Sequence, residues 1–174
     1  MKKISDNLDH NRYAENLNPF TGPHTVESKD WIDTAPFGRL LHLEIVEANN
    51  GTAVLTMPFL FDFAQGSGFM HGGALVSLAD TATVMAIKSL VPKGTHFATI
   101  SLKTTFLYPV KSGIVTAKAH VTARRKDHLY GRVTIFNRKD RPVLEFKAAF
   151  KIGKNKMIKD TSRPTVKNPI EHSK

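Results

Sequence analysis

The chain has 174 residues, a formal net charge of +10 and no cysteine. This length suits one domain with a sizeable core, and the lack of cysteine excludes a disulfide framework, thiol chemistry and thiolate metal sites. No run approaches the roughly 20 apolar residues of a membrane span. The start of the chain also lacks the apolar core of a secretory signal, so we expect a cytoplasmic protein.

The positive charge gathers near the carboxyl end, where the segment 151–174 holds seven Lys or Arg residues and two acidic ones. No aromatic residue interleaves with these lysines, and no recognisable nucleic-acid-binding motif occurs. We therefore expect a solvated basic tail rather than a specific nucleic-acid surface. The predicted organisation is an irregular polar arm over 1–35, a folded domain over 36–152 and the basic tail over 153–174.

In chain order, a short helix is expected over 28–33 with Ser28 as its cap, and Trp31 is expected to hold the arm against the core. Alternating apolar and polar residues predict strands over 41–47 and 52–57. Asn50-Gly51 predicts a type I′ turn between them. The loop 59–68 is rich in Phe and Gly and suits the wall of a pocket.

The stretch 69–87 is the centre of the chain's organisation. His71-Gly72-Gly73 opens a long apolar helix, expected over 72–89 and ended by Val91-Pro92-Lys93-Gly94. The two glycines leave the first backbone amides open to a ligand oxygen, and the positive end of the helix dipole favours a polarised carbonyl or an oxyanion. A helix this apolar must be covered on several sides.

Asp80 is the anomaly of that helix, because an ionised carboxylate among apolar residues costs several kcal/mol unless it is paired. It is either satisfied by Ser77, Thr81 or another segment, or a catalytic carboxylate with a raised pKa. His71 and Asp80 are nine positions apart, roughly 13 Å along a helix. One reacting centre can therefore involve both only in a two-fold homodimer with antiparallel central helices.

After the helix, four strands are predicted over 97–107, 113–123, 128–137 and 142–152, with short turns at 108–113, 124–127 and 138–141. This spacing predicts an antiparallel meander, and the absence of intervening helices excludes a doubly wound sheet. One buried helix on an antiparallel sheet of roughly six strands is an α+β architecture.

This order of elements, with an Asp nine residues after the His of the His-Gly-Gly motif, resembles the hotdog-fold acyl-CoA thioesterases. The likeness is strongest to the phenylacetate-pathway and 4-hydroxybenzoyl-CoA thioesterase branch. It covers about residues 36–152 and has its core in His71-Gly72-Gly73 and Leu78-Ala79-Asp80, followed by Ala82 and Ala86. The resemblance implies a hotdog fold, hydrolysis of acyl-CoA thioesters, a homodimer or a dimer of dimers, and no cofactor, since coenzyme A is part of the substrate.

The resemblance also implies catalytic roles. Asp80 attacks the thioester or activates water, the Gly72 amide polarises the thioester carbonyl, and His71 supports that turn. Gln65, six residues before the His, orients substrate or water, with an ordinary surface glutamine as the alternative. Thr99, on the strand after the helix, assists water, with an ordinary packed threonine as the alternative.

A related branch places this hydroxyl one turn after the acid, where this chain has Val84, so Thr81 and Thr83 are the other sources of a hydroxyl. Substrate contacts are expected from Gly73 and Thr81 on the helix, and from Phe69 of the preceding loop. With Phe61 and Phe63, Phe69 suggests an apolar or aromatic acyl group.

The turn Arg124-Arg125-Lys126 is the candidate for the coenzyme A phosphates, and a charged hairpin tip is the alternative. The remaining histidines show no metal-ligand spacing, so no metal is predicted. The rival functions are a non-catalytic acyl-CoA-binding sensor or scaffold, a hotdog hydratase or dehydratase, and a basic nucleic-acid-binding domain. The His-Phe-Pro-type context in which a hydratase or dehydratase holds its acid is absent from this chain.

Overall fold

The computed structural model describes residue 26 and residues 29–153. Most of the expected arm and nearly all of the expected basic tail therefore lie outside the described residues. The described elements are α1 (Pro36–Leu40), β1 (Glu44–Asn49), β2 (Thr52–Pro58), the 3-10 turn η1 (Phe61–Phe63), α2 (Gly72–Lys88), β3 (Phe97–Phe106), β4 (Ile114–Arg125), β5 (His128–Phe136) and β6 (Pro142–Ile152).

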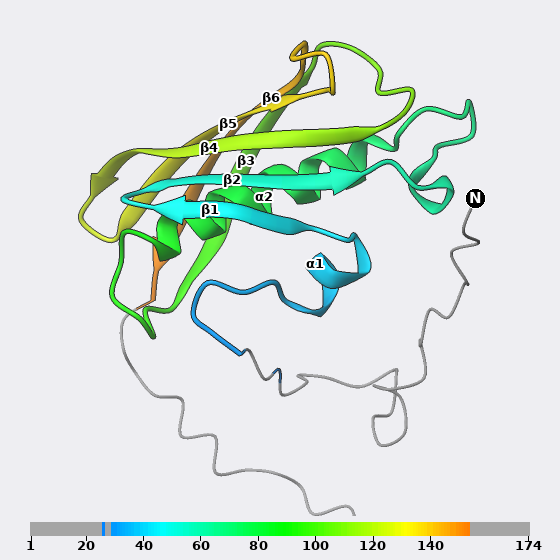
Figure 1. Ribbon diagram of the computed structural model, residues 1–174. Coiled ribbons are helices and arrows are strands. Elements are labelled where there is room, and N and C mark those ends of the chain that lie inside the picture. Colours follow the sequence, from blue (N-terminus) through cyan, green and yellow to red (C-terminus); the bar gives the residue numbers. More distant parts are fainter. Residues whose placement is uncertain (1–25, 27–28, 154–174) are drawn as a thin grey trace, which may run out of the picture.

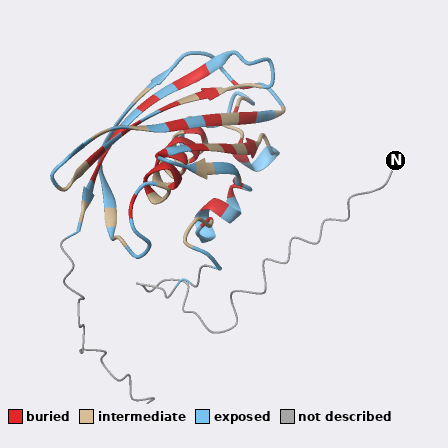
Figure 2. Ribbon diagram, turned by 60° about the vertical axis from the view of Figure 1, so that its left-hand side comes forward, coloured by how far each residue is buried: buried red, intermediate tan, exposed pale blue. Residues whose placement is uncertain are grey.

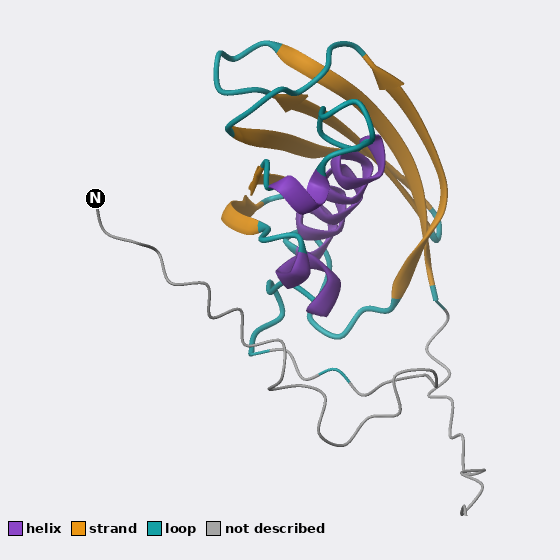
Figure 3. Cartoon of the chain, turned by 90° about the vertical axis from the view of Figure 1, so that its right-hand side faces the viewer, coloured by secondary structure: helices purple, strands orange, loops and turns teal. Residues whose placement is uncertain are grey.

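The strands form one antiparallel sheet in the order β1-β2-β4-β5-β6-β3. The sheet curves around α2, which lies along its concave face (Figures 1 and 3). This arrangement confirms the predicted α+β fold, with six strands around one long helix. Within the described residues, no helix is long and apolar enough to cross a bilayer.

Burial follows from this wrapping, and buried residues gather on α2 and on the strand positions that face it (Figure 2). Small side chains on α2 let the sheet approach closely, and Ala79, Ala82 and Ala86 are fully buried. The closest approach is at β5, where any Cβ on Gly131 would collide with the Thr83 methyl group. The helix is thus covered on several sides, as its composition requires.

The β1–β2 hairpin forms as the sequence predicts. Asn49 pairs with Thr52 across a two-residue turn, and Asn50 (φ 45°) and Gly51 (φ 81°) both have positive φ. A type I′ turn requires this conformation at both positions. Strand β1 begins later than expected because Leu41 and Leu43 are buried in the core and His42 between them is left-handed (φ 52°).

The predicted four-strand meander is wrong in one respect. Strand β3 pairs with β6 rather than with β4, and β4 pairs with β2. The segment after β3 carries the chain past the start of α2, where Val110 is buried and its carbonyl accepts from the Met70 N–H at 3.0 Å. Strand β3 is left at an edge of the sheet with one neighbour.

The short helix expected over 28–33 is also absent from its described part, where residues 29–32 form a bend. The carboxylates of Asp30 and Asp33 accept from the backbone N–H groups of Trp31 and Thr34, at 2.6 and 2.7 Å. Such local bonds compete with helix formation. Trp31 does tie this segment to the core, since its Nε1 donates to the Lys88 carbonyl at 2.9 Å.

Candidate functional site

Asp80 lies at the open edge of the sheet, facing β3. The Thr99 hydroxyl donates to Asp80 Oδ1 at 3.0 Å, so the structure joins two of the residues that the sequence singled out. Asp80 is half-buried, whereas Thr99 is exposed on the edge strand. The carboxylate is therefore partnered and still reachable from one side.

Burial raises the pKa of the Asp80 carboxyl above its ordinary value, and the hydrogen bond from Thr99 lowers it by less. Desolvation disfavours the charged form, whereas a donated hydrogen bond favours it. A carboxylate with a raised pKa is a better general base than an ordinary surface carboxylate.

A bulge in β3 determines which side chains of this strand face the same side of the sheet as Thr99. Thr99 pairs with Phe150 and Ser101 with Ala149, so Ile100 is the extra residue. Because of this bulge, Thr99 and Phe106 point to the same, concave face although they are seven positions apart. Between them, the Thr104 hydroxyl is buried and has no hydrogen-bond partner among the described residues.

The start of α2 forms a second cluster at the other end of β3. His71 is the N-cap, and its Nδ1 accepts from the Gly73 N–H at 2.9 Å. The Gly73 amide is thus occupied, which corrects the expectation that both glycine amides are open to a ligand. The Gly72 amide has no hydrogen-bond partner among the described residues, so it is the open donor.

A cavity of about 380 Å³ lies beside Gly72. It is lined by Gln65, Phe69, Met70, Gly72, Leu75, Phe106, Leu107, Tyr108, Pro109 and Val110. Gln65 belongs to a tight turn, in which its Oε1 accepts from the Ser67 N–H at 2.6 Å. The cavity thus contains three predicted site residues, Gln65, Phe69 and Gly72, but neither Asp80 nor Thr99.

The structure therefore presents two half-sites within one chain. The Asp80 half-site consists of Asp80 and Thr99, and the Gly72 half-site consists of the open amide and its cavity. Gly72 and Asp80 are separated by about 12 Å along the helix axis at the standard rise. Both residues lie on the single helix α2, so the two half-sites of one chain are well separated.

A second hollow, of about 510 Å³, adjoins the Gly72 cavity and shares Tyr108 and Pro109 with it. We call it the basic basin; its remaining lining residues are Lys111, Ser112, Asn137, Arg138, Lys139 and Arg141. The Arg141 guanidinium lies 3.3 Å from the centre of the Tyr108 ring, and Lys111 Nζ lies 5.7 Å from the Phe69 ring centre. The sequence did not reveal this basin, because the turns predicted at 108–113 and 138–141 are far apart in the chain and come together only in the fold.

The predicted phosphate residues Arg124, Arg125 and Lys126 line neither of these two hollows. Strand β4 runs to Arg125, so two of the three are strand residues rather than turn residues. They lie at the opposite end of β4 from Ile114, where the chain emerges from the basic basin. The basic basin, in contrast, adjoins the Gly72 cavity and is lined by four Lys and Arg side chains.

Of the remaining predicted residues, some lie at a half-site and others do not. Thr81 is half-buried beside Asp80 and forms no side-chain hydrogen bond among the described residues. Phe63 is buried in the core, whereas Phe61 is 91% exposed, so only Phe69 of the three phenylalanines lines the cavity. The described residues contain no group of three or more His, Cys, Asp or Glu side chains placed to hold a metal ion.

The curved antiparallel sheet, wrapped around one long helix on its concave face, defines a hotdog fold. Residues 67–144, which include the start of α2, Asp80 and Thr99, match the model of the thioesterase superfamily. The resemblance to the hotdog-fold thioesterases that the sequence indicated is therefore confirmed over this part of the chain.

Sequence relatives agree over part of their length. A protein of Halobacterium salinarum named "Putative esterase" is 28% identical over 92 residues, which are 50% of this chain and 61% of that protein. A protein of Pasteurella multocida with the same description is 39% identical over 64 residues, which are 37% of this chain and 46% of that protein. The chain thus spans less than two thirds of either relative.

Solved structures share the fold over more of the chain. The Escherichia coli PaaI protein, from the phenylacetic acid degradation operon, superposes with a TM-score of 0.63 at 28% identity, covering 68% of this chain and 84% of that one. A hypothetical thioesterase of Streptococcus pneumoniae, solved with coenzyme A, superposes with a TM-score of 0.60 at 22% identity, covering 64% and 85%. The likeness to PaaI is consistent with the branch that the sequence indicated.

Proposed function

We propose that the protein hydrolyses acyl-CoA thioesters to a free acid and coenzyme A, at sites formed by two copies of the chain. The observation that carries this proposal is the pair of half-sites at the two ends of β3. One holds a half-buried carboxylate with a raised pKa and a hydroxyl partner. The other holds an open amide at the start of a helix.

The edge position of β3 supports the homodimer. Its backbone pairs on one side only, and Ile100, Leu102 and Phe106 are each about half exposed, at 52%, 49% and 57%. An exposed apolar edge strand promotes pairing with another strand. Burial of these side chains against a second copy would remove apolar surface from water.

The register of such a pairing follows from the positions of the half-sites. Thr99 contacts Asp80, and the Phe106 ring lies against Gly72. An antiparallel pairing of two β3 strands about an axis near Leu102 and Lys103 places Thr99 of one copy beside Phe106 of the other. The Asp80 half-site of one subunit then adjoins the Gly72 half-site of its partner, twice in each dimer.

In this arrangement the Gly72 N–H donates to the thioester oxygen, and the helix start stabilises the negative charge that develops there. Asp80 of the other subunit acts as general base on water or as the nucleophile. The basic basin, which adjoins the Gly72 cavity, would hold the phosphates of coenzyme A through charge-assisted hydrogen bonds.

Thiol release over a panel of acyl-CoAs, with Asp80→Asn beside wild type, tests the chemistry. We expect turnover of at least one acyl-CoA and a loss of at least about a hundredfold in the variant, the scale of general acid–base catalysis. If Asp80→Asn hydrolyses acyl-CoA as fast as wild type does, Asp80 is not the base. Binding of acyl-CoA without turnover of any panel member would favour the non-catalytic sensor or scaffold.

Mixing subunits tests the shared site. Asp80→Asn and Gly72→Ala subunits are each expected to form inactive homodimers. Random re-association would restore one intact site in half of the dimers, about a quarter of wild-type activity, if the two residues come from different chains. A mixture as inactive as its components would overturn the proposed interface.

A further inference from the structure

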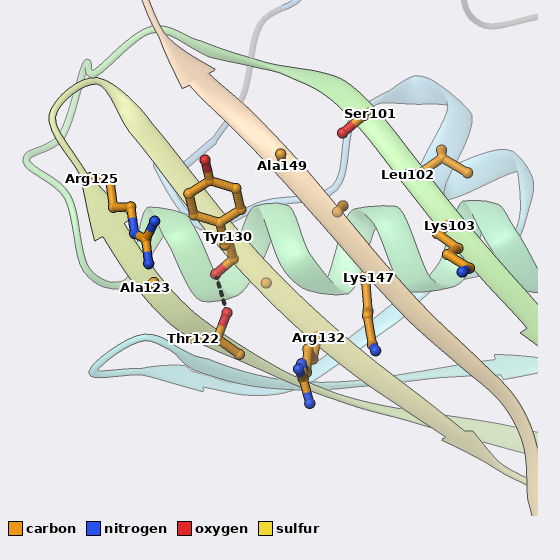
Figure 4. Close-up of a pocket in the computed structure, with 12 residues that line it drawn as sticks. Ser101, Leu102, Lys103, Thr122, Ala123, Arg125, Tyr130, Arg132, Lys147 and Ala149 are labelled. Carbon is orange, nitrogen blue, oxygen red and sulfur yellow. Dashed lines mark hydrogen bonds between the residues drawn. The ribbon is translucent and has the colours of Figure 1, made fainter.

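The convex face of the sheet, opposite α2, carries a separate groove of about 680 Å³. Figure 4 shows this groove with α2 behind the strands. Its 12 lining residues come from β3, β4, β5 and β6: Ser101, Leu102, Lys103, Thr122, Ala123, Arg125, Tyr130, Gly131, Arg132, Lys147, Ala148 and Ala149. None is acidic, and none belongs to either half-site. We call it the outer groove.

A row of cations crosses the strands along one side of the outer groove. Lys103 on β3 lies opposite Lys147 on β6, and Lys147 lies opposite Arg132 on β5. Directly opposed side chains of like charge destabilise a sheet by about 0.2–1 kcal/mol per pair. None of the three Lys and Arg residues forms an ion pair within the described part of the chain.

The next row of the sheet forms the floor of the outer groove. It runs Ser101, Ala149, Tyr130 and Ala123 across the same four strands. Three of these side chains are small, so the floor is low, and Tyr130 stands in it with 36% of its surface exposed. Arg125 lies beside Tyr130 at one end, and Lys103 lies at the other (Figure 4).

We propose that the outer groove binds a nucleoside di- or triphosphate. Adjacent strands are about 4.8 Å apart, so Lys103, Lys147 and Arg132 present three positive charges in a line along which a chain of phosphates can lie. Lys and Arg are the usual phosphate donors of proteins. The Tyr130 ring and the small residues beside it offer a face on which a base can stack.

This ligand uses both features of the outer groove, whereas an acidic peptide would neutralise the cations and leave the hollow beside Tyr130 unfilled. The site is separate from the proposed thioester chemistry, because Asp80 and Gly72 face the concave side of the sheet. The inference therefore does not depend on the proposed chemistry, although Lys103 lies on the edge strand that the proposed dimer pairs.

Calorimetric titration of the full chain with ATP, GTP and inorganic triphosphate tests the proposal. We expect a nucleotide to bind, with affinity reduced at least about tenfold in the Arg132→Ala/Lys147→Ala variant, the scale of one lost charge-assisted contact. Tyr130→Ala should weaken ATP but not triphosphate. Lys118→Ala, which removes a cation from the same face of β4 outside the groove, should bind as wild type does.

The variants carry their own check of folding. With no ligand, Lys147→Ala should melt at or above the wild-type temperature, because it relieves two like-charge pairs. Failure of every nucleotide to bind, binding only of longer single-stranded oligonucleotides, or equal losses in Lys118→Ala would each overturn the proposal. A raised KM for acyl-CoA in Lys147→Ala would also overturn it, since the groove would then belong to the substrate site.

Discussion

Replacement of Gly72 by alanine tests the open amide most directly. A Cβ at this position would lie 3.0 Å from both Cε1 and Cζ of Phe106, whereas carbon atoms prefer about 3.5–4.0 Å. The ring must therefore move by roughly 0.5–1 Å. Overpacking costs about 1–3 kcal/mol, but Phe106 is 57% exposed and can move outward, so we expect the low end of that range.

Alanine also favours a helix over glycine by about 0.5–1 kcal/mol, which offsets most of this cost. The free energy of unfolding of Gly72→Ala should therefore change by no more than about 1 kcal/mol. Activity should fall much further, because the methyl group and the displaced ring occupy the approach to the amide. Loss of one oxyanion donor typically costs about 3 kcal/mol, or about a hundredfold in kcat.

The assay is thiol release from an acyl-CoA that wild type cleaves, with chemical denaturation on the same samples. Gly66→Ala is the matched control, because a Cβ at Gly66 would meet nothing within 4 Å. A Gly72→Ala protein that turns over within about threefold of Gly66→Ala would refute the assignment of this amide, since that ratio is far below the effect of one lost donor.

Three further predictions follow from the half-sites and the basic basin. Burial raises the pKa of Asp80, so the carboxyl's contribution to stability is full at acid pH and is lost as pH rises through its folded-state pKa. Denaturation at several pH values should therefore show that Asp80→Asn is more stable than wild type at neutral pH and loses this advantage in acid. Thr99→Val removes the hydrogen bond that lowers this pKa, so the acid limb of the kcat/KM profile should move to higher pH, whereas Thr99→Ser should leave it in place. In the basic basin, Lys139→Ala should raise KM for acyl-CoA several-fold with little change in kcat, and Lys126→Ala, outside the basin, should not; equal effects would exclude the basin as the phosphate site.

Much of the fold could be predicted because its signals are local. The period of the apolar residues identified all six strands and α2, and Asn50-Gly51 specified the first hairpin. The strand order could not be predicted in the same way. Pairing of β3 with β6 rather than with β4 depends on where the chain crosses past α2, and no residue of the intervening turn encodes that partner.

The candidate site shows the same division. Asp80 and the His71-Gly72 motif stand out in the sequence because a carboxylate in an apolar helix and paired glycines at a helix start are chemically unusual. Their half-sites became visible only with the structure, since the contact between Thr99 and Asp80 depends on the bulge at Ile100. The same is true of Gly73, whose amide is taken by the side chain two residues before it.

The amino-acid sequence by itself determined the helix, the strands, the apolar surface that they share and the acid that interrupts it, because periodicity and residue chemistry act over a few neighbouring positions. Only the tertiary structure decided that the β5–β6 turn supplies cations beside the Gly72 cavity, and that like charges line up across three strands of the convex face. These juxtapositions depend on sheet order and register, which arise from packing between segments far apart in the chain.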